Sequence, residues 1–162
     1  LMKPAGSFAD PVKGYAAYRA SVPGGSYDTL VVPIDLLYNQ FNYGETSPMA
    51  IYEFMRFMTE KGYPKYLFLI GKGRDVFSDF HRKTSTSEIM DLVPSAGFPG
   101  SDMNFTVGLN GTVFEPAVPT GRLTATTPAE VSAYLNKIKE FESPVAVNLW
   151  QKQGLHLSGG IE

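Results

Sequence analysis

The chain has 162 residues, 43% hydrophobic and 13% aromatic, so it can bury a sizeable core and is not disordered. A formal net charge of −2 gives no electrostatic basis for binding nucleic acid or an anionic membrane. The absence of cysteine excludes a disulfide, a thiolate zinc site and a cysteine nucleophile within these residues. No apolar run approaches the ~20 residues of a membrane span, so we expect no direct membrane insertion.

The first part of the chain predicts a strand end followed by a helix. Residues 1–3 could close a strand, and Asp10 with Pro11 is typical of a helix start. Residues 12–19 then carry apolar side chains at helical spacing. The turn at residues 23–25, Pro-Gly-Gly, ends this helix.

A second strand and two further helices are expected next. Residues 29–34 are β-branched and apolar, but Pro33 cannot donate to a ladder, which favours an edge strand or a strand end. Residues 36–41 predict a short helical turn. Ser47 and Pro48 repeat the capping pattern, and the helix after them has a core-facing stripe: Ile51, Phe54, Met55 and Met58.

The unbroken apolar run that ends at Ile70 is the expected centre of the sheet. A strand with one wet face would alternate, so residues 66–70 predict a strand covered on both faces, as in a parallel sheet. The turn Gly71-Lys72-Gly73 follows at once. Loops at the carboxyl ends of such strands are where ligands tend to bind.

A long irregular stretch separates this strand from the next pattern. Residues 74–101 contain no clear element, and loops of this length are usually functional or mobile. Residues 104–109 alternate and lead into Asn110-Gly111, which predicts a hairpin with residues 112–114.

The clearest helix lies near the carboxyl terminus. Residues 119–123 predict a turn, and Thr127 with Glu130 forms a capping box around a proline. The helix that follows has the apolar face Val131, Tyr134, Leu135, Ile138 and Phe141. Residues 155–160 predict another strand that ends in glycines.

Together these elements predict a three-layer α/β fold with a mainly parallel sheet flanked by helices, similar to a flavodoxin-like lobe. We expect about four strands, with residues 66–70 in the centre. Residues 1–162 form a single α/β lobe. Neither end resembles a natural terminus, so we expect an excised fragment of a larger protein.

Nucleotide binding is the first chemistry to weigh. Gly71 and Gly73 follow a buried strand, as in a dinucleotide fingerprint, but the third glycine is replaced by Val76 and no helix pattern follows. A plain tight turn is therefore the favoured interpretation. A free-standing nucleotide- or flavin-binding module remains the alternative function.

The two histidines are weak candidates for a metal ligand or a general base. His81 lies in the long loop near Asp75, Asp79 and Arg82, and a solvated loop histidine is the simpler interpretation. His156 alternates within an apolar strand pattern, which favours a satisfied core or edge histidine.

Oxygen ligands for calcium could come from Asp91, Asp102 and Asn104, but their spacing matches no EF-hand loop. Capping and turn hydrogen bonds explain these residues more simply. No Gly-x-Ser-x-Gly elbow supports a serine nucleophile. We therefore assign no catalytic residue, no metal and no cofactor.

Arg122 is the most informative charged residue, because it stands in an otherwise apolar, turn-forming segment. Its five donors could hold loop carbonyls or a nearby carboxylate such as Asp102. We expect Asp102 and Arg122 to anchor a loop or a cleft rather than to contact substrate.

Several motifs in this order resemble the gingipain-type family of cysteine peptidases, over nearly the whole chain. The similar segments are Leu37-Tyr38-Asn39-Gln40-Phe41, Tyr43-Gly44, Ser47-Pro48, Ala50-Ile51, Tyr66 to Gly71, Val93-Pro94, Gly100-Ser101-Asp102, Gly121-Arg122-Leu123, Thr127 to Val131, Tyr134-Leu135 and Lys137-Ile138. Their spacing is closer to the sortase-like members of the type IX secretion system than to the secreted gingipains.

The resemblance implies a caspase-like catalytic domain of two α/β lobes, with the catalytic His and Cys in the second lobe. This chain would then be the non-catalytic amino-terminal lobe, inactive alone, of a cysteine endopeptidase exported by Bacteroidetes-type bacteria. Its implied partners are the missing catalytic lobe and, for the parent, a protein or peptide substrate. The implied location is the periplasm, outer membrane or cell surface. A purely structural interaction domain of a secreted assembly is a third possibility.

Overall fold

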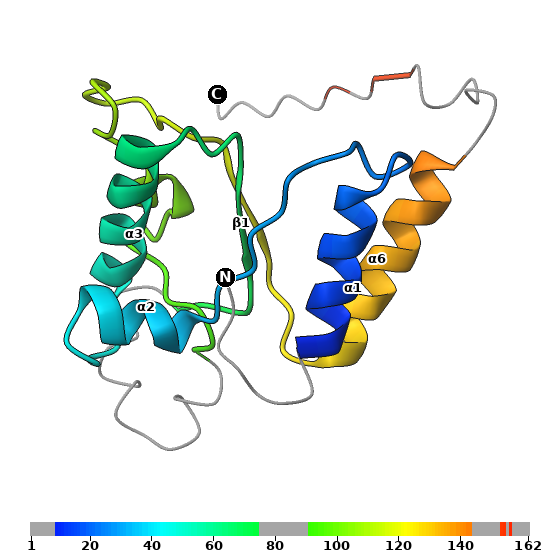
Figure 1. Cartoon of the computed structure of the whole chain (residues 1–162), viewed down its shortest axis with the longest axis horizontal. Coiled ribbons are helices and arrows are strands. Elements are labelled where there is room, and N and C mark those ends of the chain that lie inside the picture. Colours follow the sequence, from blue (N-terminus) through cyan, green and yellow to red (C-terminus); the bar gives the residue numbers. More distant parts are fainter. Residues whose placement is uncertain (1–8, 75–90, 144–152, 155, 157–162) are drawn as a thin grey trace, which may run out of the picture.

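Helices lie on both sides of a pair of parallel strands in the computed structural model (Figure 1). The structure describes residues 9–74, 91–143, 153–154 and 156. Its elements are α1 (Ala9–Ala20), α2 (Ile34–Phe41), α3 (Pro48–Lys61), β1 (Leu67–Ile70), the 3-10 helix η2 (Asp102–Phe105), β2 (Thr120–Leu123) and α6 (Pro128–Glu142). The predicted α/β class and three-layer arrangement are confirmed. None of the helices in the described residues is long and apolar enough to cross a membrane.

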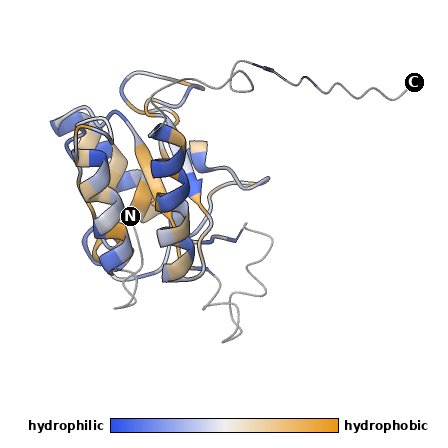
Figure 2. Cartoon of the chain, turned by 90° about the vertical axis from the view of Figure 1, so that its right-hand side faces the viewer, coloured by the Kyte–Doolittle hydropathy of each residue, from blue (hydrophilic) through white to orange (hydrophobic). Residues whose placement is uncertain are grey.

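β1 is apolar on both faces because each face packs against its own helix layer. Leu67 and Leu69 join the core formed with α2 and α3, whereas Ile70 joins a second core with α1 and α6, and the half-buried Phe68 packs against that second core. Figure 2 shows the hydrophobic strands between the two helix layers. The unbroken apolar run therefore predicted the position of β1 correctly.

β2 corrects the prediction of a turn at residues 119–123. Thr120 to Leu123 forms a strand that pairs in parallel with β1, in a register that places Leu67 opposite Thr120 and Ile70 opposite Leu123. Gly121 and the charge of Arg122 are atypical of a strand. The tertiary structure offsets that charge with Asp102, as described below.

The predicted strand at residues 29–34 is not formed. Residues 29–32 belong to no strand, and Leu30 is 65% exposed because no helix layer covers it. Pro33 forms a single β-bridge and occupies the N-cap position of α2, without a side-chain capping bond. Since residues 1–3 and, except His156, residues 155–160 lie outside the described residues, the described sheet has two strands rather than about four.

The predicted hairpin is only partly present. Asn110 and Gly111 form the expected turn, with φ of 56° and 83°. However, η2 replaces the first strand, and a single bridge joins Val107 to Pro116. Gly108 has a φ of 74°, which interrupts the extended backbone that a strand requires.

The helix caps follow the sequence closely. The Ser47 hydroxyl accepts a hydrogen bond from the Met49 amide (3.2 Å), and the Thr127 hydroxyl accepts one from Glu130 (3.4 Å). The return bond of the capping box is displaced by one residue, because the Glu130 carboxylate accepts from the Thr126 amide at 2.7 Å.

The predicted apolar faces of α3 and α6 are buried at their centres, but the face of α6 is exposed at its carboxyl end. Ile51 and Met55 are buried in α3, and Val131 and Leu135 are buried in α6. Phe141 is exposed, because the last turn of α6 extends beyond the apolar core. Helical spacing identifies a face, but only the packing decides how far along the helix that face is covered.

Candidate functional site

The carboxyl ends of β1 and β2 meet at one edge of the sheet, and the loops beyond them form the candidate site. The segment after residue 90 crosses this edge. The amides of Leu92 and Val93 both donate to the Lys72 carbonyl, at 2.8 and 3.1 Å. In open α/β sheets this edge is where ligands and chemistry are usually found.

Close backbone approach explains the two glycines of the turn after β1. Gly71 has a φ of 140°, and a Cβ there would lie 2.8 Å from Val93 Cγ2. A Cβ on Gly73 would collide with the Val93 carbonyl oxygen and lie 3.0 Å from Arg122 Nη1. The turn therefore needs glycine in order to pack beneath the crossing segment.

Arg122 holds this edge together. Its Nε and Nη2 donate to the two oxygens of Asp102, each at 2.7 Å. Nη1 donates to the carbonyls of Gly71 (2.8 Å) and Val93 (2.6 Å), and Nη2 donates to Pro94 (3.0 Å). We call these five residues the Arg122 clamp.

The clamp joins four segments of the chain around a side chain that is only 8% exposed. It fixes the end of β1, β2, residues 93–94 and the start of η2. All five guanidinium donors are used within the chain, so none is left for a ligand carboxylate or phosphate. The arrangement is that of a loop anchor, and a role of Asp102 and Arg122 in binding stays a prediction.

The proposed oxygen ligands for calcium are engaged in other contacts. Asp91 is buried and accepts a hydrogen bond from the Arg74 amide at 3.0 Å. Asp102 belongs to the clamp, and the Asn104 amide donates to the Ala96 carbonyl at 3.0 Å. Among the described residues, no group of three or more His, Cys, Asp or Glu could hold a metal ion.

The turn after β1 does not resemble a phosphate cradle. Such a cradle needs several free backbone amides. Here the amides of Gly71 and Lys72 donate to Leu123 and Ala125 at 2.9 and 3.0 Å. The Arg74 amide is used by Asp91. The geometry therefore gives no support to nucleotide binding at this turn.

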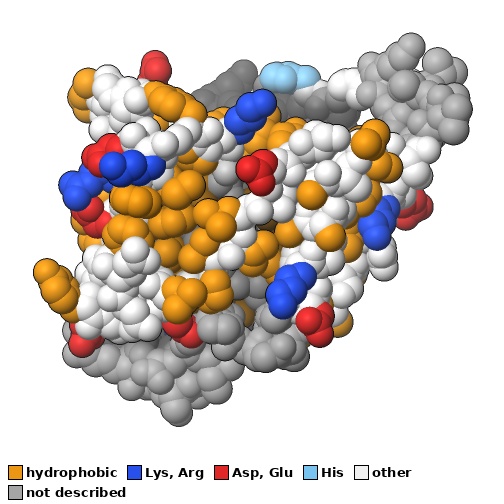
Figure 3. All heavy atoms as spheres, in the orientation of Figure 1, with side chains coloured by type: hydrophobic (Ala, Val, Ile, Leu, Met, Phe, Trp, Pro, Cys, Tyr) orange, Lys and Arg blue, Asp and Glu red, His pale blue; other side chains and the backbone are white. Residues whose placement is uncertain are grey.

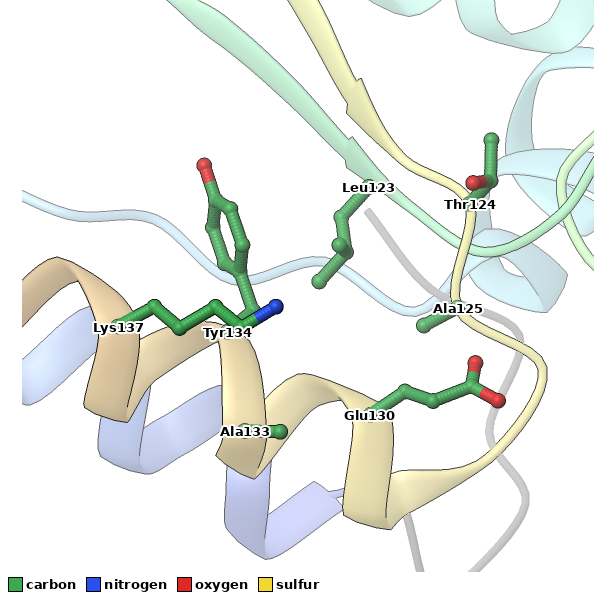
Figure 4. Close-up of a pocket in the computed structure, with 7 residues that line it drawn as sticks. All are labelled: Leu123, Thr124, Ala125, Glu130, Ala133, Tyr134 and Lys137. Atoms are coloured by element: carbon green, nitrogen blue, oxygen red, sulfur yellow. The ribbon is translucent and has the colours of Figure 1, made fainter.

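A shallow hollow of about 280 Å³ lies beside β2 and under α6 (Figure 4). Glu130 at its rim is held by the helix cap, and the hydrogen bond from the Thr126 amide lowers the pKa of its carboxyl. Burial raises the pKa of Tyr134. Figure 4 shows Lys137 extending from α6 toward Leu123. The lining residues are Leu123, Thr124, Ala125, Glu130, Ala133, Tyr134 and Lys137.

A polar network on the outer surface joins α1 to α6. Arg19 donates to Glu142 at 2.9 Å and to the Tyr15 hydroxyl at 3.1 Å, and the Tyr18 hydroxyl donates to Glu142 at 2.7 Å. That last bond is the main cause of a raised pKa at Tyr18. Partial burial acts to raise the pKa of Glu142, but the bonds from Tyr18 and Arg19 outweigh it and lower the pKa. The network is structural and contains no nucleophile.

The histidines contribute no site in the described structure. His81, with Asp75, Asp79 and Arg82, lies outside the described residues. His156 is exposed, so a position in the core is wrong. The alternative of an edge histidine stays a prediction, because Leu155 and Leu157 lie outside the described residues.

Two features of the site were not predicted from sequence. The clamp acceptors Gly71, Val93 and Pro94 are backbone carbonyls, which any residue type supplies, so no side-chain pattern marks them. Lys137 at the hollow was noted only as part of a family motif, because exposed lysines are common on helices. The pairing of Arg122 with Asp102 was the part that residue chemistry could suggest.

Comparison with known proteins gives one family and one structural relative. A model of peptidase family C25 matches residues 3–162. Dimeric latent PorU from Porphyromonas gingivalis matches with a TM-score of 0.65 and 16% identity, over 81% of this chain and 14% of its own. This likeness shows the fold alone, and the chain matches only a small part of that relative. Curated proteins gave no match.

Proposed function

This chain belongs to peptidase family C25, and from that premise we propose that it is the non-catalytic amino-terminal lobe of a gingipain-like cysteine peptidase. The observation that carries the proposal is the absence of cysteine from all 162 residues, although the family match extends over nearly the whole chain. Without a thiolate the family's chemistry needs residues from elsewhere. In the parent, that chemistry would be proteolysis or sortase-type processing of secreted proteins.

The composition of the carboxyl edge supports this role. The strongest polar constellation there, the Arg122 clamp, is internally satisfied and holds loops rather than a reacting group. A lobe of this kind contributes shape to a cleft and leaves bond cleavage to its partner. The partner is the catalytic lobe of the same peptidase. The parent is an exported protein of the periplasm, outer membrane or cell surface, as the resemblance to the sortase-like members of the family implies.

Exposed apolar surface also supports docking to a further lobe. Leu36 on α2 and Met49 and Phe57 on α3 are exposed. Figure 3 shows hydrophobic side chains gathered over the α2–α3 half of this face. Large exposed apolar surface is typical of interaction sites.

A peptidase assay with the purified chain tests the proposal. We expect no hydrolysis of casein or of a mixed set of fluorogenic peptides, with or without a reducing agent. Adding the catalytic lobe in trans should then restore activity that neither part shows alone. Hydrolysis by this chain alone, or a catalytic lobe that gains nothing from it, would contradict the proposal.

A ligand titration tests the alternative module. If the chain bound a nucleotide or flavin, ligand at a hundred times its dissociation constant would add about 2.7 kcal/mol to the free energy of unfolding. We expect no shift of Tm with ATP, NAD, FAD or FMN.

A further inference from the structure

The turn at Asn110 and Gly111 brings together a side chain and a backbone nitrogen that can react with each other. Both residues are exposed, and their φ angles are 56° and 83°. Positive φ at both central residues is the geometry of a type I′ turn. No other asparagine of the sequence precedes a glycine, so this pair is chemically distinct from the rest of the chain.

The reaction open to this pair is deamidation through a succinimide. The Gly111 backbone nitrogen attacks the carbonyl carbon of the Asn110 side chain, a new C–N bond forms, and the bond to the side-chain nitrogen breaks. Solvent base takes the proton of the Gly111 amide, and the side-chain nitrogen leaves as ammonia. Water then opens the ring at either carbonyl and gives aspartate or isoaspartate. Gly111 favours the attack, because it has no Cβ to crowd the forming ring.

The folded turn opposes this ring closure. In a type I′ turn, ψ of the first central residue is about 30°. That angle places the Asn110 Cβ almost opposite the Gly111 nitrogen about the Cα–C bond, whereas a five-membered ring needs the two atoms on the same side. The bond must therefore rotate first, and the reaction proceeds only when the turn opens.

Two hydrogen bonds to one carbonyl hold the turn closed. The Thr112 amide donates to the Leu109 carbonyl at 3.1 Å, and the Thr112 hydroxyl donates to the same oxygen at 2.8 Å. Leu109 is buried in the core with α2 and α3, which fixes the position of that carbonyl. The Thr112 hydroxyl is thus the side-chain group that sets how often the turn opens.

Asn104, in the same part of the chain, provides an internal comparison. Its amide donates to the Ala96 carbonyl at 3.0 Å, and it belongs to the 3-10 helix η2. The residue after it, Phe105, is fully buried. A bulky and fixed neighbour hinders the attack of its backbone nitrogen, so we expect Asn104 to be stable where Asn110 reacts.

We propose that Asn110 is a modification site, where spontaneous deamidation gives aspartate and isoaspartate at a rate set by the Thr112 hydroxyl. Aspartate is among the residues that tolerate positive φ, so the aspartate form keeps the turn. Isoaspartate adds a methylene to the backbone, breaks the match between Thr112 and Leu109, and loosens the segment between η2 and β2. The reaction needs only the pair itself and water, and it is independent of the function proposed for the parent.

Incubation of the full 162-residue chain, followed by peptide mapping with mass spectrometry, tests the proposal. At physiological temperature, the folded chain should convert Asn110 into both aspartate and isoaspartate, about tenfold more slowly than the chain in urea. The rate should rise with hydroxide concentration, because the Gly111 amide must lose its proton. Asn104 should stay unchanged in the same folded samples.

Variants at Thr112 separate control by the turn from overall stability. Thr112→Val removes the hydroxyl bond with little change of shape, so conversion should become about threefold to tenfold faster in the folded chain and stay unchanged in urea. Thr112→Ser keeps the hydroxyl and should keep the wild-type rate. Thr59→Val is the matched control, because the Thr59 hydroxyl donates to the Arg56 carbonyl at 2.9 Å within α3. It should leave the rate at Asn110 unchanged.

Each part of the proposal has a result that would overturn it. Equal rates in the folded chain and in urea would show that the turn does not control the reaction. Equal acceleration by Thr112→Val and Thr59→Val would make overall stability the cause. Aspartate without any isoaspartate would exclude the succinimide. A folded chain that kept Asn110 intact over several weeks at alkaline pH would exclude the site itself.

Discussion

Arg122 shows how one residue can organise an edge of the sheet. A buried guanidinium is costly to desolvate unless each donor has an acceptor. Here the carboxylate of Asp102 supplies two acceptors, and three loop carbonyls supply the others. The glycines of the preceding turn let those carbonyls come close enough. The burial of the Arg122 charge therefore depends on the backbone conformation of the glycine turn as well as on Asp102.

Removal of the guanidinium should be strongly destabilising. Arg122→Ala leaves the Asp102 carboxylate and three carbonyls without their donor, so we expect a loss of about 3–5 kcal/mol in the free energy of unfolding. Arg122→Lys keeps the positive charge but not the planar set of five donors, so it should retain only part of the lost free energy of unfolding. Urea denaturation followed by circular dichroism measures both. Arg56→Lys, at an exposed arginine that pairs with Glu53 in the described structure, serves as control and should change little.

Gly73 should tolerate no side chain. Gly73→Ala places a methyl group against the Val93 carbonyl and the Arg122 guanidinium, which should cost about 1–3 kcal/mol. Gly62→Ala is the matched control, because no atom lies within 4 Å of a Cβ there and its φ of −169° is extended. If both variants unfolded at the same urea concentration, the close approach would not be the reason for the glycine.

At the scale of elements, α1 and α6 pack as a pair over one face of the sheet. Tyr15 stacks on Phe68 of β1, with ring centroids 5.2 Å apart, and Phe68 stacks on Tyr134 of α6 at 6.1 Å. The polar network of Arg19, Tyr18 and Glu142 then closes the outer side. The pair is thus held by aromatic contacts inside and by hydrogen bonds at the surface.

Acid should weaken this helix pair. Because the pKa of Glu142 is lowered in the folded state, its contribution is present above the ordinary glutamate pKa of about 4.3 and is lost as pH falls through the lowered value. Glu142→Gln should therefore lower Tm at pH 7 slightly and flatten its fall between about pH 5 and pH 3. Glu140→Gln removes a similar charge from the same turn and should keep the wild-type slope in thermal melts.

The helix caps should each contribute measurably. Ser47→Ala and Thr127→Ala delete the hydroxyl that accepts the first free amides of α3 and α6, at a cost of about 1 kcal/mol each. Ser132→Ala is the control, since that hydroxyl donates to the Pro128 carbonyl inside the helix. Its removal should be nearly neutral in urea denaturation, and a loss equal to that at the caps would count against the capping argument.

For the whole molecule, the described two-strand sheet lies between two apolar cores, and its residues contribute side chains to both. Leu69 is fully buried in the core with α2 and α3, whereas Ile70 is buried in the core with α1 and α6. Adjacent residues of one strand therefore belong to different cores. We therefore expect the chain to unfold as one cooperative unit.

Shortening one core side chain at a time tests whether the chain unfolds as one cooperative unit. Leu69→Ala and Ile70→Ala should each cost about 2–5 kcal/mol, and each variant should unfold in a single transition. Tryptophan-independent probes, such as far-ultraviolet circular dichroism and tyrosine fluorescence, should give coincident curves. Two separate transitions would show that residues 1–162 are not a single lobe.

Residue patterns alone determined much of this fold. An unbroken apolar run predicted β1, and apolar residues at helical spacing predicted α3 and α6, because a buried face requires apolar side chains at regular positions. The caps at Ser47 and Thr127 were predicted because they are local hydrogen bonds. The chemistry of an arginine fork also suggested the pairing of Arg122 with Asp102.

Only the tertiary structure decided the rest. It made a strand of Thr120 to Leu123, since Asp102, distant in sequence, offsets the charge that argued against one. It left Leu30 uncovered and Phe141 beyond the core. It also brought the carbonyls of Gly71, Val93 and Pro94 together around one guanidinium. Helix and strand propensities and helix caps depend on neighbouring residues, so the sequence predicts them. The burial of an apolar side chain, the pairing of a charge and the approach of backbone carbonyls depend on segments that meet only when the chain is folded.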